Sequence, residues 1–113
     1  MSPITTHILD TSLGEPAAGV EVVLESGKDG TWTRIGKGTT NGDGRIGDLL
    51  SDDATLGKGE YRLTFETGAY FSAQGRESFY PGVTVRFQVR DPAQHHHVPL
   101  LLNPFGYSTY RGS

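Results

Sequence analysis

The chain has 113 residues, no cysteine and a formal net charge of −3 at pH 7, with acidic and basic residues interspersed. This length fits one domain, residues 1–113, and the lack of cysteine excludes disulfides and thiolate chemistry. The sequence has no basic run that could follow a phosphate backbone, no apolar segment of about eighteen residues, and no signal-like leader after Met1. We therefore expect a cytoplasmic protein that binds neither nucleic acid nor membranes.

Alternating segments separated by glycine-rich turns fill the first half of the chain. In residues 4–10, Ile4 and Ile8 share one face of a predicted strand and His7 lies on the other. Two turn-forming segments follow, residues 28–30 (Lys-Asp-Gly) and residues 41–44 (Asn-Gly-Asp-Gly). Between these signals, the pattern predicts strands at residues 4–10, 20–25, 32–40 and 45–50.

The second half contains the clearest strand and the only predicted helix. After an acidic loop at residues 51–53, alternation predicts strands at residues 61–66, 83–90 and 95–102, with a returning strand after a turn at residues 104–106. A short helix is predicted from about residue 69 to residue 77, interrupted by Gly75. Seven or eight short strands, 16 glycines and one helix predict an all-β fold, an antiparallel β-sandwich of two sheets.

The strand at residues 95–102 carries three consecutive histidines. Val98, Leu100 and Leu102 share one face, which we expect to face the core together with His96. His97 then points the opposite way, as does His95. An outward imidazole that titrates near neutral pH is typical of a reactive site rather than of packing.

The terminal segment HHHVPLLLNPFGYSTYRGS, residues 95–113, resembles a signature of the 5-hydroxyisourate hydrolases, which is roughly HYHVPLLLSPYGYSTYRGS. These are transthyretin-related enzymes of purine breakdown. The opening ITTHILD, residues 4–10, is similar to their other signature. The YRGS ending is the specific part, because it separates the hydrolases from the hormone carrier transthyretin. His96 stands where the family usually has tyrosine, which we interpret as a tolerated packing change.

The resemblance implies a transthyretin-like fold of two four-stranded sheets with one short helix, and the number of predicted strands agrees. It implies hydrolysis of 5-hydroxyisourate at a cyclic amide, in the breakdown of urate, without a metal or another cofactor. It also implies a homotetramer whose sites lie at the dimer–dimer interface. A second subunit would close a site that one small domain leaves open to water.

Matching the family's positions residue by residue gives the candidate site. The catalytic candidates are His7, Arg45 and His97. The substrate-binding candidates are His7, Arg45, Tyr110, Arg111 and Ser113. A neutral imidazole can take a proton from the attacking water, and a guanidinium can stabilise the oxyanion that forms. His97 paired with Arg45 is our choice for activating the water.

Three other interpretations compete with the hydrolase. His95, His97 and His7 could form a three-histidine zinc site, although no nearby carboxylate is evident that could accept a hydrogen bond from these rings. The chain could be a transthyretin-like carrier of a small ligand, or a β-sandwich interaction module without catalytic activity. A serine nucleophile is disfavoured, because Ser108 has no evident base partner.

Overall fold

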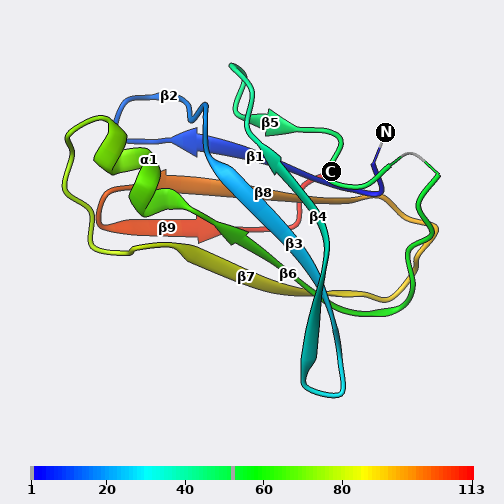
Figure 1. Cartoon of the computed structure of the whole chain (residues 1–113). Helices are drawn as coiled ribbons and strands as arrows, with labels where there is room; N and C mark the ends of the chain where they lie inside the picture. The colour runs from blue at the N-terminus through cyan, green and yellow to red at the C-terminus, as the bar shows by residue number, and fades with distance from the viewer. Residues whose placement is uncertain (1, 52) are drawn as a thin grey trace.

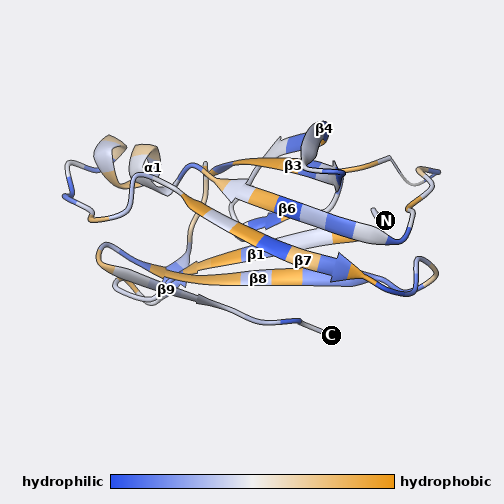
Figure 2. Ribbon diagram, turned by 90° about the horizontal axis from the view of Figure 1, so that it is seen from below, coloured by the Kyte–Doolittle hydropathy of each residue, from blue (hydrophilic) through white to orange (hydrophobic). Residues whose placement is uncertain are grey.

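The strands form two sheets that pack face to face, as two views of the computed structural model show (Figure 1; Figure 2). The structure describes residues 2–51 and 53–113. One sheet contains β1 (Ile4–Asp10), β2 (Glu15–Pro16), β5 (Arg45–Ile46), β8 (His96–Asn103) and β9 (Gly106–Thr109). The other contains β3 (Glu21–Lys28), β4 (Thr31–Thr39), β6 (Gly59–Phe65) and β7 (Val83–Val89). The strand orders are β2-β1-β8-β9, with β5 also on β1, and β4-β3-β6-β7.

The short helix α1 (Thr67–Ala73) connects the second sheet's β6 to β7 and lies at one end of the molecule (Figure 1). It begins and ends earlier than the predicted range of residues 69–77. Gly75 adopts φ 67° just after it. The N–H groups of Gly75 and Arg76 donate to the carbonyls of Ser72 and Phe71. This pattern is a Schellman motif, which ends a helix with a left-handed residue.

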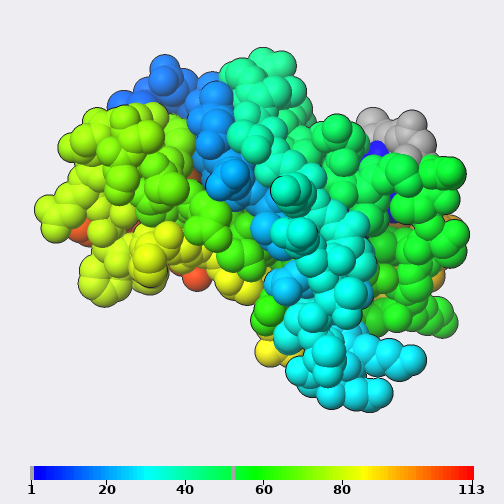
Figure 3. Space-filling model, viewed as in Figure 1, coloured from blue at the N-terminus to red at the C-terminus, as the bar shows by residue number. Residues whose placement is uncertain are grey.

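The β3–β4 hairpin was correctly located by its Lys-Asp-Gly signal. Asp29 and Gly30 both have positive φ, 53° and 79°. Two such residues form a type I′ turn, whose twist matches that of the flanking strands. The tip of this hairpin projects well beyond the rest of the molecule (Figure 3).

The predicted strand at residues 45–50 is much shorter in the structure, where β5 ends at Ile46. Its continuation bonds to the start of the chain instead of joining a ladder. Ser2 donates its N–H to the carbonyl of Gly47, and its Oγ accepts the N–H of Leu50. Leu49 turns into the core, where it is 3% exposed.

Two further segments differ from, or fall partly outside, the predicted pattern. Residues 15–16, which lie outside the predicted strands, pair with the end of β1 as β2. In the predicted acidic loop, Ser51 Oγ donates to Asp53 Oδ1 at 2.8 Å. Asp52, the middle residue of that loop, lies outside the described residues.

The pairing of β1 with β8 is parallel, whereas every other strand pair among the described residues is antiparallel. The predicted antiparallel sandwich therefore contains one parallel pair. In this register Thr5 lies opposite His97, and Asp10 lies opposite Leu102. A parallel pair requires a long crossover, and here that crossover includes the whole second sheet. Residues about ninety positions apart in sequence thus become neighbours.

The core lies between the sheets and follows the alternation of the strands, which is visible as alternating colours along β6 and β7 (Figure 2). Its fully buried side chains include Ile4, Ile8, Leu24, Leu63, Phe65 and Leu100. Burying one such side chain stabilises the fold by about 1.5–3 kcal/mol. Since Val98, Leu100 and Leu102 face inward, the neighbouring His97 faces outward as predicted, and His96 is buried on the inner side.

A buried carboxylate fixes α1 and its following loop to the end of β1. The Asp10 side chain is fully buried and forms an ion pair with Arg76. It also accepts hydrogen bonds from the Tyr70 hydroxyl at 2.8 Å and from the backbone N–H of Ser12 at 3.1 Å. Although burial opposes it, this bonding holds the pKa of Asp10 below its ordinary value.

Replacing Asp10 with asparagine should destabilise the fold. Removing one partner of a buried, hydrogen-bonded ion pair leaves the other charge uncompensated, so we expect a loss of about 3 kcal/mol in the free energy of unfolding, measured by urea denaturation at pH 7. Because the folded pKa of Asp10 is lowered from 3.8, the wild type should lose this contribution as the pH falls through the folded pKa. The Asp10→Asn variant should depend less on pH there.

The exposed pair of Glu60 and Arg86 provides the control. Glu60→Gln should change the unfolding free energy far less, because solvent screens a surface pair. If Asp10→Asn and Glu60→Gln lowered the free energy of unfolding equally, the buried bonds of Asp10 would contribute no more than an exposed ion pair.

Candidate active site

The three catalytic candidates lie on adjacent strands of one sheet, with β1 in the middle. His7 on β1 lies directly opposite Arg45 on β5. Two residues earlier on the same face of β1, Thr5 lies opposite His97 on β8. The backbone register therefore places one imidazole and one guanidinium from distant parts of the chain on either side of β1.

The Asn-Gly-Asp-Gly turn before β5 is what positions Arg45. The Asn41 side-chain oxygen accepts the N–H groups of Asp43 and Arg45, at 2.9 and 3.0 Å. Gly44 has φ 73°, and a Cβ on it would come within 2.4 Å of the Ile8 carbonyl oxygen. Glycine is required at this position by both backbone conformation and space. The turn thus packs closely on β1 and delivers Arg45 beside it.

Arg45 and His97 border the same hollow, which has a volume of about 330 Å³. Its lining residues come from β1, β5, the end of the β7–β8 connection, β8 and the chain's end: Thr5, Thr6, Arg45, Ile46, Gly47, His95, His97 and Ser113. His97 is half-buried and Arg45 is exposed. A concave site with a few convergent polar groups is the usual form of a small-molecule site.

Burial and the nearby cation together favour neutral histidines at this site. Burial lowers the pKa of His97, and the positive charge of Arg45 lowers it further. The same two causes, in the same order, lower the pKa of His7, against an opposing effect of Asp43. Both rings should therefore be uncharged near neutral pH, the form in which an imidazole can accept a proton.

The Thr5 hydroxyl joins two of the three consecutive histidines. Its Oγ1 lies 2.8 Å from His95 Nε2 and 2.8 Å from His97 Nδ1. The sequence pattern did not single out Thr5. Its only signal was that it shares a face with His7, and strand threonines are too common for that to be informative.

The final residues are held against β8. Gly112 donates its N–H to the His97 carbonyl at 2.8 Å, and a Cβ on Gly112 would come within 2.6 Å of His97 Cδ2. Arg111 Nη2 donates to Gln94 Oε1 at 3.1 Å. This close approach brings Ser113 to the edge of the hollow.

Tyr110 lies elsewhere in the single chain. It is 58% exposed and, with Arg111, borders a second hollow of about 310 Å³ between β7 and β8. His97 borders both hollows. The structure thus brings Arg45, His97 and Ser113 to one hollow and His7 next to Arg45, while Tyr110 and Arg111 lie on the other side of His97.

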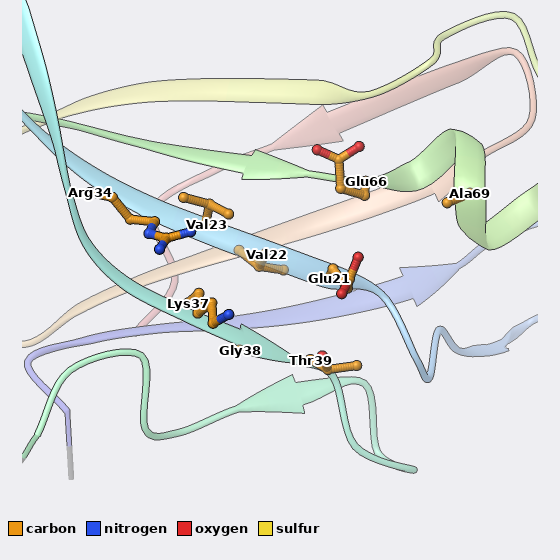
Figure 4. A pocket seen from close by; sticks show the side chains of 9 residues that line it. All are labelled: Glu21, Val22, Val23, Arg34, Lys37, Gly38, Thr39, Glu66 and Ala69. Atoms are coloured by element: carbon orange, nitrogen blue, oxygen red, sulfur yellow. The ribbon is translucent and has the colours of Figure 1, made fainter.

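A larger hollow is on the other sheet and contains none of the predicted site residues. It covers about 510 Å³ above β3, β4 and the start of α1 (Figure 4). The carboxylates of Glu21 and Glu66 lie toward one end, and the cationic side chains of Arg34 and Lys37 lie toward the other (Figure 4). Its lining contains no histidine, so size alone does not locate the reactive site.

The described residues give no geometric support to the zinc alternative. Within residues 2–51 and 53–113, no three His, Cys, Asp or Glu side chains are arranged to hold a metal ion together. Catalytic zinc usually has three protein ligands.

Among residues 2–51 and 53–113, no helix is both long and apolar enough to cross a membrane.

A family model described as the HIUase/Transthyretin family matches residues 4–112. This chain belongs to that family. A 5-hydroxyisourate hydrolase of Salmonella dublin is 48% identical over 110 residues, which cover 97% of this chain and 80% of that protein. The resemblance noted at the two signatures is therefore confirmed.

Solved structures confirm the predicted fold. The 5-hydroxyisourate hydrolase of Klebsiella pneumoniae is 43% identical, with a TM-score of 0.82 and coverage of 97% of this chain and 92% of that chain. Sea bream transthyretin, solved in complex with thyroxine, is 34% identical, with a TM-score of 0.90 and coverage of 98% and 95%. The transthyretin-like sandwich is thus shared with an enzyme and with a thyroxine-binding protein, so its shape does not separate them.

Removing the Arg45 charge should raise the pKa of His97 and of His7. In Arg45→Met, both rings lose a nearby positive charge that disfavours their protonation, so both titrations should move toward higher pH. The measurement is an NMR pH titration of the histidine ring protons. Arg34→Met, which removes a cation from the other sheet, should leave both values unchanged. A His97 titration that is the same in Arg45→Met and wild type would place the guanidinium away from this ring.

Proposed function

We propose that this protein hydrolyses 5-hydroxyisourate to 2-oxo-4-hydroxy-4-carboxy-5-ureidoimidazoline, in the breakdown of urate. The observation that carries the proposal is that Arg45 and His97 border one hollow. The identity to hydrolases of Salmonella and Klebsiella, together with the YRGS ending, supports this substrate. We also propose that residues 1–113 form one domain, since both sheets contribute to one core, and that the protein acts in the cytoplasm.

In the proposed reaction His97 acts as the general base. Its neutral ring takes a proton from water while the water oxygen attacks the carbonyl carbon of the cyclic amide. The negative charge that forms on the carbonyl oxygen is stabilised by the Arg45 guanidinium. The C–N bond then breaks, the leaving nitrogen takes the proton from His97, and the new carboxylic acid ionises. No cofactor or metal enters these steps.

The other candidates have binding roles in this proposal. His7, opposite Arg45, orients or protonates a ring atom of the substrate. Tyr110 supplies a hydroxyl and Ser113 a hydroxyl and carboxylate. Arg111 contacts the substrate in our sequence-based assignment. Its hydrogen bonds to Gln94 and to the His95 carbonyl favour an additional role in holding the tail.

A thyroxine-type carrier is the second candidate, because the sea bream transthyretin complex has the higher TM-score. It is disfavoured by the side chains at the hollow and by His7 beside it. A carrier of an apolar ligand has no use for two imidazoles whose pKa is lowered beside a guanidinium. An interaction module without catalytic activity does not require these two imidazoles either.

The first test follows the decay of 5-hydroxyisourate, generated in the cuvette from urate by urate oxidase. The wild type should accelerate its ultraviolet decay. His97→Ala and Arg45→Ala should each lower kcat/KM by about 10²–10³, the usual cost of removing a general base or an oxyanion-stabilising group. No acceleration at micromolar wild-type protein would reject the function.

Two matched variants control for nonspecific damage. Arg34→Ala removes an arginine from the other hollow. His96→Tyr replaces the neighbouring histidine with the tyrosine that is usual in the family, at a buried position whose Nδ1 has no hydrogen-bond partner among the described residues. Both should keep wild-type rates. Losses in the controls equal to those in His97→Ala and Arg45→Ala would remove the support for their catalytic roles.

We further propose that the active form is a homotetramer with its sites at the dimer–dimer interface. The hollow is open, and Arg45 and Tyr110 are exposed in the single chain. A site that is to exclude water needs a cover, and a second copy facing this sheet would provide one.

This assembly can be tested by dilution. Sedimentation velocity at micromolar concentration should show a tetramer. Turnover per subunit should fall at the dilution at which the tetramer dissociates, because an uncovered site loses its exclusion of water. A monomer that kept full turnover would rule out the proposed arrangement.

A further inference from the structure

One hydroxyl group lies between two imidazole rings at the candidate active site. Thr5 Oγ1 is 2.8 Å from both His95 Nε2 and His97 Nδ1. A hydroxyl carries one proton, so it can donate to only one of these nitrogens. The other nitrogen must then carry a hydrogen and donate it to Oγ1. The two hydrogen bonds must therefore run the same way. Donation goes either from His97 through Thr5 to His95, or from His95 through Thr5 to His97.

The two directions give His97 opposite chemistry. In the first, His97 Nδ1–H donates to Thr5, Thr5 donates to His95 Nε2, and the lone pair of His97 is on Nε2. In the second, Thr5 donates to His97 Nδ1, and the neutral ring carries its proton on Nε2. Only the first direction leaves Nε2 able to accept a proton from water.

The placement of the His97 ring favours the first direction. Thr5 Oγ1 occupies Nδ1, so Nε2 is the ring nitrogen left for a water molecule in the hollow that His97 borders with Arg45. The base role proposed for His97 requires a lone pair on that nitrogen. A neutral ring with its lone pair on Nε2 carries its hydrogen on Nδ1, which then donates to Thr5.

We propose that Thr5 and His95 are positioning residues that hold neutral His97 in the Nδ1-protonated tautomer, with its Nε2 lone pair available for catalysis. The proposal rests on the proposed function, and the direction of the hydrogen bonds can be measured without an assay of activity.

A purely structural role for the Thr5 hydroxyl is the competing explanation. The attachment of β1 to β8 does not depend on it, because the backbone ladder pairs the two strands along the whole of β1. The neighbouring Thr6 already donates its hydroxyl to the Val98 carbonyl at 2.6 Å. The Thr5 hydroxyl instead contacts only ring nitrogens among its side-chain bonds to described residues. A tautomer measurement distinguishes the two explanations.

The experiment uses ¹⁵N NMR of histidine-labelled full-length protein, in which protonated and unprotonated ring nitrogens resonate in separate regions. In the wild type, at a pH above the His97 titration, Nδ1 of His97 should be protonated and Nε2 unprotonated. Thr5→Val, which removes the hydroxyl with little change in shape, should convert His97 to a mixture of tautomers. Thr5→Ser should restore the wild-type signal.

His95 should act only through Thr5. His95→Phe removes the acceptor for the Thr5 hydroxyl, so a fraction of His97 should shift to the tautomer protonated on Nε2. In the Thr5→Val background, the same His95→Phe change should not alter the tautomer ratio of His97 any further. Thr11→Val is the matched control, because Thr11 also donates its hydroxyl to β8, at Leu102, but lies beyond the hollow. It should leave the tautomer unchanged.

Kinetics then connect the tautomer to catalysis. In Thr5→Val, kcat should fall by about 10- to 100-fold while KM changes less than about twofold, because the base and not the binding is affected. Thr5→Ser and Thr11→Val should keep kcat near that of the wild type. A proton on His97 Nε2 in the wild type, or an unchanged tautomer in Thr5→Val, overturns the proposal. A wild type with the expected tautomer but no hydrolase activity overturns the proposed function and the base role, and leaves the hydrogen-bond direction established.

Discussion

The parallel pairing of β1 with β8 is the constraint on which the site depends. It brings Thr5 opposite His97, and the opposite edge of β1 holds Arg45 through its pairing with His7. A shift of one residue in this register would turn every side chain of one strand to the other face. Apolar residues on the inner faces, Ile4 and Ile8 on β1 and Leu100 on β8, prevent that shift because they would leave the core. The packing of the core thus determines which polar groups meet on the outer face.

The electrostatics of the site follow from this arrangement. In water, an imidazole of ordinary pKa 6.5 is partly charged near neutral pH, and the charged form cannot accept a proton. Here partial burial and the adjacent guanidinium both favour the neutral ring. The same cation that is proposed to stabilise the oxyanion therefore also disfavours protonation of His97. In the proposed reaction Arg45 would thus meet two requirements of hydrolysis, and the tight turn at Gly44 places it.

Much of the fold could be predicted from the sequence because alternation reports burial directly. The outward direction of His97 and the inward direction of His96 both followed from the alternation of apolar residues along β8. The shortened β5 could not be predicted, because its continuation bonds to Ser2, a partner far away in sequence. The parallel pair was missed for a similar reason, since period-two alternation is the same for either strand direction. The contact of Thr5 with two histidines depends on that pairing, so no local pattern could show it.

The comparison with transthyretin shows that the sandwich alone does not determine function. A thyroxine-binding protein and a hydrolase have nearly the same sandwich as this chain. Such agreement is expected if the inner faces determine the fold, because many apolar sets of similar volume fill one core. The outer face of β1, β5 and β8 is free of that requirement, so its side chains can change without altering the sandwich. The imidazoles, the guanidinium and the hydroxyl between two rings lie on that face. Function in this family is therefore better inferred from the outward residues of a few strands than from the similarity of the fold.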